Sequence, residues 1–582
     1  MQDRWFTDRR VGERFPYYTR GNAADVLADP VSPLGWTFLW EGAISRGARD
    51  GFIVFGLVDW DEFETPDDPE CFGLFGGYFY NPLSIVRLMG ARLPGASPEQ
   101  IDRAYFDPNP EIPPYIAEPW HESERHAAKL GESLGWVMST DALREVDEEK
   151  VLADRLREDR PDLAAAGDGA LLARARSLRP YLQQMFETSI WASLGASVGP
   201  GALGAIAEGL GDPTLTIRLL GGIEVDSAKP TFAMWELSRQ VRSSEQLSRE
   251  FDAGVAGLPE RLAALTSADG TAFNEAFARF VRNFGSRGPN EWDLRCRSWE
   301  THPQMAFAAI DRMRAADHSA SPTTRHDQAV ADRERAAADV RERLREAGAD
   351  GAEALGTFEA AMRSSGVFLP ARERYKTNCI KVIGEIRVCF LELGRRMVEK
   401  GALDTADQVW FLVEGELDHF RHEPGAFTDT LRRRESEHRE LYELEPPFMV
   451  TNAAKPLDEW TRRGGTTVAL AEVGTVLSGT AGSGGHARGR ARVLLDPSDP
   501  FALEPGDILV TLNTDPSWTP LFVPAAGVVT EIGALGSHAM IISRELGIPC
   551  VVSVKDATKV IPDGAEVTVD GTLGTVTIGA SE

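Results

Sequence analysis

The sequence predicts a multidomain fold, in which a large, mainly α-helical region is followed by a compact α/β domain. The chain has 582 residues, and one hydrophobic core rarely grows beyond about 300 residues, so two or three domains are expected. From about Pro98 to Met449, apolar residues recur at three- and four-residue spacing, which is typical of helices. After about Arg462 the pattern changes to short β-rich runs separated by turns.

The predicted helical region spans residues 1–465. Its first part, residues 16–90, is rich in aromatic residues, glycine and proline, which predicts a loop-rich N-terminal layer with few regular elements. The stretch from Thr188 to Ala207 carries no charge, but its apolar content is modest, and glycine and proline interrupt it. A membrane span needs about 20 strongly apolar residues, so we interpret this stretch as a buried helix and a turn.

One helix of this region carries a pair of cations. It is predicted to start after Pro370 and to end at Gly401, the usual placement of proline and glycine at the two ends of a helix. Arg372 and Lys376 lie four residues apart near its predicted start, so their side chains can converge. Two positive groups beside a helix N-terminus suit a phosphoryl group in transfer, whose charge spreads over its oxygens. A solvated pair on the helix surface is the alternative.

Residues 486–582 are predicted to form the α/β domain, and residues 466–485 a flexible linker or domain entry rich in glycine. Six runs have the residue types of strands. They are ARVLL, DILVTL, GVVTE, PCVVSV, EVTVD and GTVTI. One helix is expected between the third and the fourth run.

This expected helix places a histidine in an unusual position. Ser537 suits an N-cap, Gly547 lies where a helix commonly ends, and Pro549 follows. His538 is therefore in the first turn, where free backbone N–H groups and the positive end of the dipole favour an anion. A neutral imidazole there can attack phosphorus, and the helix end is expected to lower its pKa. A purely polar helix cap is the alternative.

Composition argues against several classes of partner. Acidic residues outnumber basic residues by 89 to 62, a formal net charge of −27, and such a surface repels nucleic acid and anionic membranes. Five widely spaced cysteines without a CxxC pattern indicate reduced thiols, and the N-terminus lacks the apolar core of a signal peptide. We expect a cytoplasmic protein that binds neither nucleic acid nor membranes.

No metal site is expected from the histidines of HESERH, His121 and His126. Their spacing is one residue too long for the zinc motif HExxH, so the two rings face apart on a helix.

The segment GALGSHAMIISRELGIPCVV around His538 resembles the phosphohistidine (swivelling, or mobile) domain of the PEP-utilising enzymes. The preceding ARVLLDPSDPFALEPGDILVTLNTDPSWTPLFVPAAGVVTEIG matches the same domain. The departure is in the turn, where the family usually has two adjacent glycines and this chain has Gly533 followed by Ala534. The resemblance implies a covalent phosphohistidine at His538. It also implies that Arg544 and Glu545 help to dock the domain, with a plain solvated pair as the alternative.

The residues before this domain resemble the substrate domain of rifampin phosphotransferases and the large subunit of phenylphosphate or alkylphenol (4-methylphenyl) phosphate synthases. The matching stretches are NAADVLADPVSPLGW, FGGYFYNPLS, MWELSRQVRSS, FGSRGPNEWDL and RERYK. In RERYK the resemblance assigns Arg372 and Lys376 to the transfer site. Arg287 and Glu291 align with a family motif that commonly has histidine where this chain has Ser286. The favoured interpretation of Arg287 and Glu291 is an internal ion pair. The alternative is that these two residues, together with Ser537, bind phosphate or substrate.

The resemblance also implies a partner. The sequence has no GxxxxGK[ST] loop, and GPGALG follows no predicted strand, so we expect a separate ATP-grasp subunit that binds ATP and Mg²⁺. That subunit would place the β-phosphoryl group on His538, which would pass it to an acceptor hydroxyl, preferably a phenol.

The acceptor barrel of the dikinases does not follow, so pyruvate is a poor candidate. The alternatives are a component of a rifamycin-type antibiotic phosphotransferase and a regulatory phosphocarrier without a small acceptor.

Overall fold

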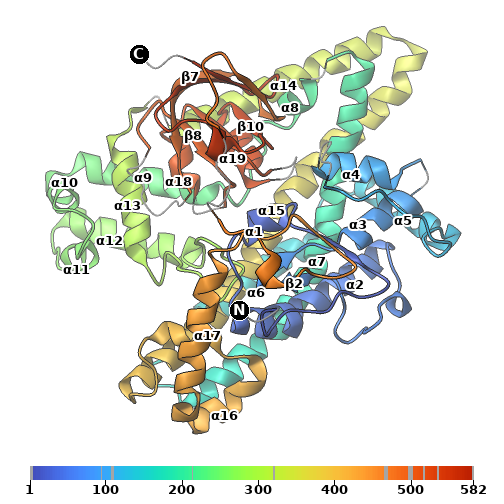
Figure 1. Ribbon diagram of the computed structural model, residues 1–582. Helices are drawn as coiled ribbons and strands as arrows, with labels where there is room; N and C mark the ends of the chain where they lie inside the picture. The colour runs from blue at the N-terminus through green and yellow to red at the C-terminus, as the bar shows by residue number, and fades with distance from the viewer. Residues whose placement is uncertain are drawn as a thin grey trace.

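The computed structural model describes residues 4–93, 95–106, 111–212, 214–318, 321–463, 469–495, 503–515, 518–533 and 537–579. Figure 1 shows a mainly helical region that runs from the blue N-terminal helices to the orange helix α17 (Thr428–Leu441). A red α/β domain packs against one side of it. The order of the two regions agrees with the prediction.

Two long helices form the centre of the helical region. α7 (Asp168–Gly209) and α15 (Ala349–Glu399) pack along each other. They are joined by α6 (Arg144–Glu158), α5 (Glu124–Ser139) and α2 (Ser45–Phe55), and the largest hydrophobic core lies among these helices.

The predicted start of α15 is wrong. The helix begins at Ala349, and Pro370 lies inside it. An interior proline removes a backbone donor and crowds the preceding turn, at a cost of about 3 kcal/mol. Phe368 and Ala371 beside it are buried in the core, and this burial offsets the cost. The predicted end is confirmed, because Gly401 follows the helix with φ of +72°.

The uncharged stretch Thr188–Ala207 lies wholly within α7, so the predicted turn is wrong, although the burial is confirmed for much of it. α7 is also the one helix, within the described residues, that is long and apolar enough to cross a membrane. It packs against α15 and α2, and this packing accounts for its apolar residues.

The N-terminal layer is more regular than predicted. A π-helix, η1 (Gly35–Ile44), continues directly into α2. Trp36, Phe38 and Trp40 are buried, and a segment buried on most sides lacks the amphipathic period that identifies a surface helix. Two small β-pairs complete this layer. They are β1 (Tyr17–Thr19) with β4 (Met449–Thr451) and β2 (Gly73–Phe75) with β3 (Tyr78–Tyr80).

The helices α9 to α13 form a second core, separate from the first. The remaining helical elements of this region are α1 (Ala23–Val26), η2 (Trp60–Glu62), α3 (Leu83–Arg92), α4 (Pro98–Phe106), α8 (Leu215–Leu219), α9 (Lys229–Ser243), α10 (Glu245–Asp252), α11 (Leu258–Ala263), α12 (Ala268–Phe284), α13 (Pro303–Ala315), α14 (Pro322–Glu346), η4 (Ala406–Phe411), η5 (Glu414–Glu416), α16 (Leu417–His422), η6 (Pro424–Phe427) and η7 (Leu457–Glu459).

The C-terminal domain is built on an eight-stranded sheet of order β5-β12-β11-β7-β8-β9-β10-β6. Its centre, β7 to β10, is parallel, and the outer strands pair antiparallel. All six predicted strands are present: β7 (His486–Val493), β8 (Ile508–Thr511), β9 (Gly527–Thr530), β10 (Cys550–Val552), β11 (Glu566–Asp570) and β12 (Thr575–Ile578). The predicted helix is α19 (His538–Leu546), and two short helices, α18 (Thr519–Phe522) and α20 (Ala557–Val560), accompany it.

The predicted linker overlaps this sheet. Residues 464–468 lie outside the described residues, but β5 (Val476–Ser478) and β6 (Thr480–Ser483) are strands at the two edges of the sheet. The domain therefore includes residues that the sequence assigned to the entry segment. Glycines lie before, between and after these two short strands, so the sequence of the stretch has the composition of a linker.

The α/β domain is docked on the helical region. α19 packs against α14, and α18 packs against α13 and α9, as Figure 1 shows. Val523 belongs to the core of helices α9 to α13, while Val225 and Ala228 belong to the core of the α/β domain. Side chains of each region thus complete the core of the other.

Candidate functional site

His538 begins helix α19, as predicted. Ser537 is the N-cap with extended backbone (φ −68°, ψ 153°), and Gly547 ends the helix with φ of +60°. The Ser537 hydroxyl caps no backbone N–H, and it is buried without a hydrogen-bond partner among the described residues. Residues 534–536, which include the Ala534 departure, lie outside the described residues. The first turn of α19 thus presents backbone N–H groups and an unused hydroxyl beside the imidazole.

Two hydroxyl groups hold the imidazole ring. Thr514 Oγ1 lies 2.9 Å from Nδ1, and Thr519 Oγ1 lies 3.1 Å from Nε2. Phe522 meets the ring edge-on at 5.9 Å between centroids. Only 8% of His538 is exposed. Each ring nitrogen therefore has one neutral partner, which suits an uncharged imidazole.

Burial of His538, and then the charges of Lys376 and Arg287, hold the pKa of the imidazole well below its ordinary value. The predicted direction agrees, but burial is the largest cause. A ring with a low pKa keeps a free lone pair at neutral pH, which a nucleophile requires.

The carboxylate of Glu291 contacts both Arg287 and Lys376. Glu291 Oε2 lies 2.8 Å from Arg287 Nε, and Glu291 Oε1 lies 3.4 Å from Lys376 Nζ. Arg287 also donates to the Thr377 hydroxyl at 2.9 Å. The side chains of Arg287 and Glu291 are 1% and 2% exposed. The predicted ion pair is confirmed, and it lies close enough to His538 to act on its pKa.

Arg372 is placed differently from the prediction. Neither Arg372 nor Lys376 is near a helix N-terminus, because both lie well inside α15. Arg372 is partly exposed, and its charge acts on Tyr375, whose hydroxyl lies 2.7 Å from that of Ser193. The charge that reaches His538 from this helix is that of Lys376.

The loop that carries Arg287 is held by an arginine that the sequence analysis missed. Arg387, 1% exposed on α15, donates to four backbone carbonyls of this loop. They are those of Ser286 (3.2 Å), Glu291 (3.0 Å), Asp293 (3.0 Å) and Leu294 (3.0 Å). The helix α15 therefore carries both Lys376 and Arg387, the residue that holds the loop of Arg287.

In the Arg544–Glu545 pair, Glu545 contacts the helical region, whereas the hydrogen bond of Arg544 lies within the α/β domain. Glu545, 2% exposed, forms an ion pair of 2.8 Å with His326 of α14. Arg544 donates to the Gly482 carbonyl at 2.8 Å. The interpretation as a solvated pair is wrong, because both side chains lie at the contact of the two regions.

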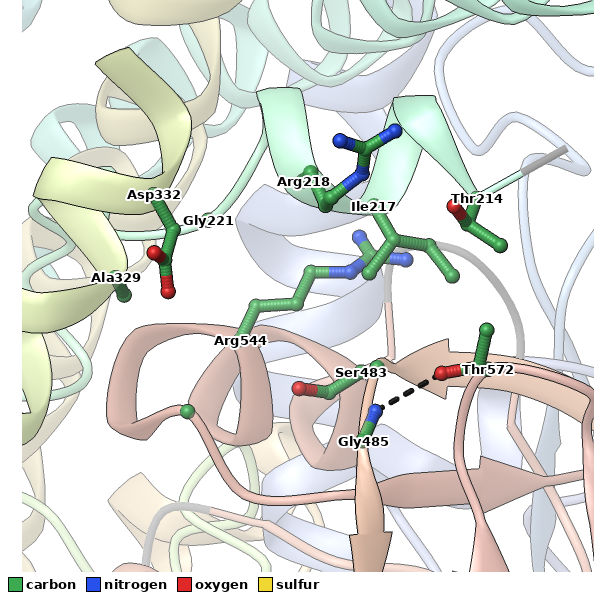
Figure 2. A pocket seen from close by; sticks show the side chains of 12 residues that line it. Thr214, Ile217, Arg218, Gly221, Ala329, Asp332, Ser483, Gly485, Arg544 and Thr572 are labelled. Carbon is green, nitrogen blue, oxygen red and sulfur yellow. Dashed lines mark hydrogen bonds between the residues drawn. The ribbon is translucent and has the colours of Figure 1, made fainter. Parts of the chain in front are cut away.

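Arg544 also lines a cavity of about 250 Å³ between the two regions. Figure 2 shows Arg544 extending beneath Ile217 and Arg218 of α8, with Asp332 of α14 to one side. The strands of the α/β domain close the opposite wall with Ser483 and Thr572. This cavity is near the end of α19 that is remote from His538, so we assign it to the docking surface.

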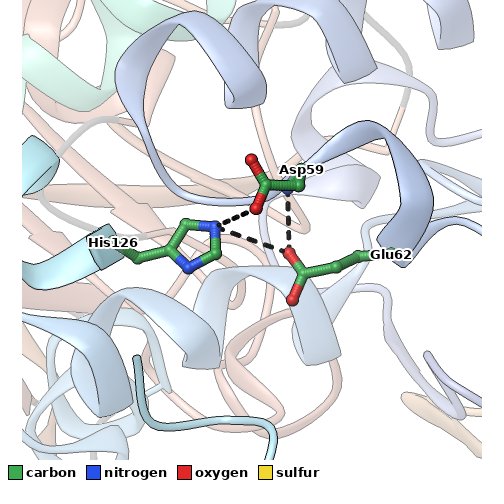
Figure 3. Close-up of side chains that lie close together, drawn as sticks. All are labelled: Asp59, Glu62 and His126. Atoms are coloured by element: carbon green, nitrogen blue, oxygen red, sulfur yellow. Dashed lines mark hydrogen bonds and ion pairs between the residues drawn. The ribbon is translucent and has the colours of Figure 1, made fainter. Parts of the chain in front are cut away.

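The described residues hold one group with the geometry of metal ligands, Asp59, Glu62 and His126 (Figure 3). His126 Nε2 lies 3.1 Å from Asp59 and 3.7 Å from Glu62. Arg92 binds Glu62 with one contact of 2.9 Å, and Arg125 binds Asp59. Two arginines already neutralise both carboxylates, which does not suit a cation. His121 lies 2.6 Å from Tyr115 and precedes α5, so the two histidines of HESERH are in separate surroundings, but they do not share a helix as predicted.

Comparison with known proteins identifies two segments. A model of the rifampicin phosphotransferase fourth domain matches residues 184–373. A model of the PEP-utilising enzyme mobile domain matches residues 503–574, which include His538. The first segment ends three residues before Lys376.

Curated relatives extend over more of the chain. An uncharacterised protein of Mycobacterium tuberculosis is 27% identical over 98% of this chain and 62% of its own length. Prodigiosin synthesizing transferase PigC of Serratia marcescens is 26% identical over 99% of this chain and 64% of its own length. Rifampicin phosphotransferase of Streptomyces sviceus is 30% identical over 63% of this chain and 41% of its own length. The chain thus spans less than two thirds of the length of these relatives.

Proposed function

We propose that this chain, which carries the mobile domain of the PEP-utilising enzymes and a domain of the rifampicin phosphotransferase type, is the phosphohistidine-carrying part of an ATP-driven phosphotransferase. His538 receives the β-phosphoryl group of ATP and passes it to an acceptor hydroxyl. One water molecule takes the remaining phosphoryl group, so the products are a phosphate monoester, AMP and phosphate. The observation that carries the proposal is the buried, uncharged imidazole of His538 at a helix N-terminus, whose pKa the charges of Lys376 and Arg287 help to lower.

The transfer step uses this arrangement. The acceptor oxygen forms a bond to phosphorus, the bond from nitrogen to phosphorus breaks, and its electron pair returns to the imidazole. The hydroxyl proton leaves to solvent. Lys376 and Arg287 stabilise the charge on the phosphoryl oxygens, and backbone N–H groups of α19 and the Ser537 hydroxyl are free to add donors. A low pKa of His538 makes the imidazole a better leaving group.

For the acceptor we propose a phenol. The charges that act on His538 are both positive, and positive groups favour the ionised form of a bound hydroxyl. A phenol ionises near pH 10, judging by tyrosine, so such a pocket can activate it without a strong base. The names of the relatives support a second candidate, a rifamycin hydroxyl. An aliphatic hydroxyl depends more on a general base, and Glu291 is already paired with two cations.

For the donor we propose a separate ATP-grasp subunit that binds ATP with Mg²⁺. The docked position of His538 on the helical region, with 8% of the residue exposed, supports a domain that moves between two sites. In this position the imidazole is covered, so it must leave the helical region to meet a donor.

The test examines the loading of His538 from ATP and the transfer to the acceptor as two separate steps. The chain, mixed with a candidate ATP-grasp subunit, is incubated in parallel with [β-³²P]ATP and [γ-³²P]ATP. We expect acid-labile, base-stable label on wild type from the β position only, and none on His538→Gln. A chase with phenols, rifamycins and aliphatic alcohols then identifies the acceptor class. Label that resists every hydroxyl would favour the regulatory phosphocarrier, and absence of label with an active donor would contradict the proposal.

A further inference from the structure

Three consecutive residues after strand β8 contact three different parts of the molecule. Asn513 donates its side-chain amide to the Ala24 carbonyl of α1 at 2.6 Å. Thr514 Oγ1 lies 2.9 Å from His538 Nδ1. The side chain of Asp515 accepts the backbone N–H of Asn290, in the loop that carries Arg287, at 3.3 Å. The outer two residues therefore bind the helical region, while the middle one binds the imidazole.

We propose that Thr514 is a positioning residue for the transfer step, and that Asn513 and Asp515 couple its position to docking of the mobile domain. The inference rests on the proposed function of His538. It goes beyond that function because it assigns a role to residues 513–515.

The physical reason is the tautomer of the ring. A neutral imidazole carries one N–H and one lone pair, and the hydrogen bond at one nitrogen selects the state of the other. When Nδ1–H donates to Thr514, the lone pair lies on Nε2, the nitrogen farther from the backbone, which can reach an external phosphorus. The Thr519 hydroxyl then donates to Nε2 in the unphosphorylated protein. A phosphoryl group on Nε2 displaces that contact, whereas the contact to Thr514 persists.

Docking fixes Thr514 from both sides. Asn513 is 9% exposed and Thr514 is 2% exposed, so this segment is buried at the contact of the two regions. Release of the domain breaks the contacts of Asn513 with Ala24 and of Asp515 with Asn290, which hold the segment of Thr514 in place. The ring is therefore fully oriented only in the docked position, where Lys376 and Arg287 can stabilise the phosphoryl group in transfer.

The variants are chosen to separate orientation from stability. Thr514→Val removes the hydroxyl and keeps the shape, and Thr514→Ser restores the hydroxyl. Thr519→Val is the matched control, because it removes the partner of the other nitrogen. Asn513→Ala tests the coupling to docking. Circular dichroism and urea unfolding of each full-length variant establish that it is folded.

Two measurements do not depend on an acceptor. Nitrogen-15 spectra of histidine-labelled protein, with His538→Gln to assign the signal, report the tautomer. Phosphoramidate, a small phosphoryl donor, charges the histidine chemically, and the lability of the product identifies the nitrogen that carries phosphate. We expect the Nδ1–H tautomer and phosphate on Nε2 in wild type, Thr514→Ser and Thr519→Val. We expect a mixture of the two tautomers in Thr514→Val. In Asn513→Ala we expect the population of the Nδ1–H tautomer to fall as well.

The third measurement is single-turnover transfer from the charged protein to the acceptor. We expect it to fall roughly tenfold or more in Thr514→Val and to recover in Thr514→Ser. An unchanged tautomer in Thr514→Val, or phosphate on Nδ1 of wild type, overturns the positioning role. A wild-type tautomer in Asn513→Ala overturns the coupling. If no hydroxyl accepts phosphate, the proposed function fails, while the spectra still decide the role of Thr514.

Discussion

Lys376 on α15 holds its charge close enough to His538 on α19 to lower the pKa of the imidazole, in addition to the larger effect of burial. The same charge attracts phosphoryl oxygens. In the proposed transfer, one side chain thus serves two needs, a weakly basic leaving group and a positive pocket. Glu291 also pairs with this side chain, at 3.4 Å.

Replacement of Lys376 by methionine tests this relationship. We expect the pKa of His538 to rise towards its ordinary value of about 6.5, because one of the two cations that lower it is lost. Transfer from the charged protein should slow by about 10²-fold or more, as when one preorganised donor is removed from an active site. Nitrogen-15 titration gives the pKa, and single-turnover kinetics give the rate. Lys376→Arg keeps the charge and should retain most of the shift; an unchanged pKa in Lys376→Met would contradict the assignment.

Glu291→Gln should destabilise the helical region. The substitution leaves the Arg287 guanidinium, 1% exposed, without its charged partner. Breaking a buried ion pair by removing one member costs about 3 kcal/mol or more, so the free energy of unfolding should fall by about this amount. Urea unfolding measures it. The double variant Arg287→Met with Glu291→Met should cost less than the sum of the single variants, and full additivity would argue against a coupled pair.

Arg387→Met should weaken both the fold and the transfer. The substitution leaves four buried carbonyls without their donor, and each unsatisfied group costs about 1–3 kcal/mol. The loop that carries Arg287 should then loosen, so transfer slows although Arg387 does not touch His538. Hydrogen exchange of residues 286–294 should increase. Arg387→Lys keeps the charge but lacks the fork of donors, so recovery by lysine would show that charge alone matters.

The sequence predicted the local surroundings of His538 well. The strand β9, the N-cap, the helix and the left-handed Gly547 are all determined within about 20 residues, where capping rules apply directly. The six strands of the C-terminal domain were recognised for the same reason. Both edge strands, β5 and β6, were missed, because the glycines around them give this stretch the composition of a linker.

The rest of the site depends on contacts between distant segments. Pro370 indicated a helix start, but burial of its neighbours overrides that local signal. Arg387 lies in the same helix as Lys376, and only the fold shows that its guanidinium meets the loop of Arg287. Thr514 and Thr519 are common residue types in loops, so no sequence pattern marks them as partners of His538.

The ion pair of His326 and Glu545 should make docking depend on pH. Glu545 raises the pKa of His326 in the docked state, and burial raises the pKa of Glu545. Both groups therefore take up protons on docking, which makes docking stronger as pH falls. For His326 the stabilisation is fully present below about pH 6.5, its ordinary pKa, and is lost as pH rises through the raised value.

We therefore expect the radius of gyration from small-angle X-ray scattering to increase as pH rises above about 6.5, as the mobile domain is released. His326→Gln should flatten this dependence. His486 provides the matched control, because it pairs with Asp570 at 2.8 Å within the mobile domain and is well exposed. His486→Gln should retain the wild-type profile, since its pair is present in both positions of the domain. If His326→Gln and wild type gave the same profile, another group would control docking, because the ion pair to Glu545 is lost in that variant.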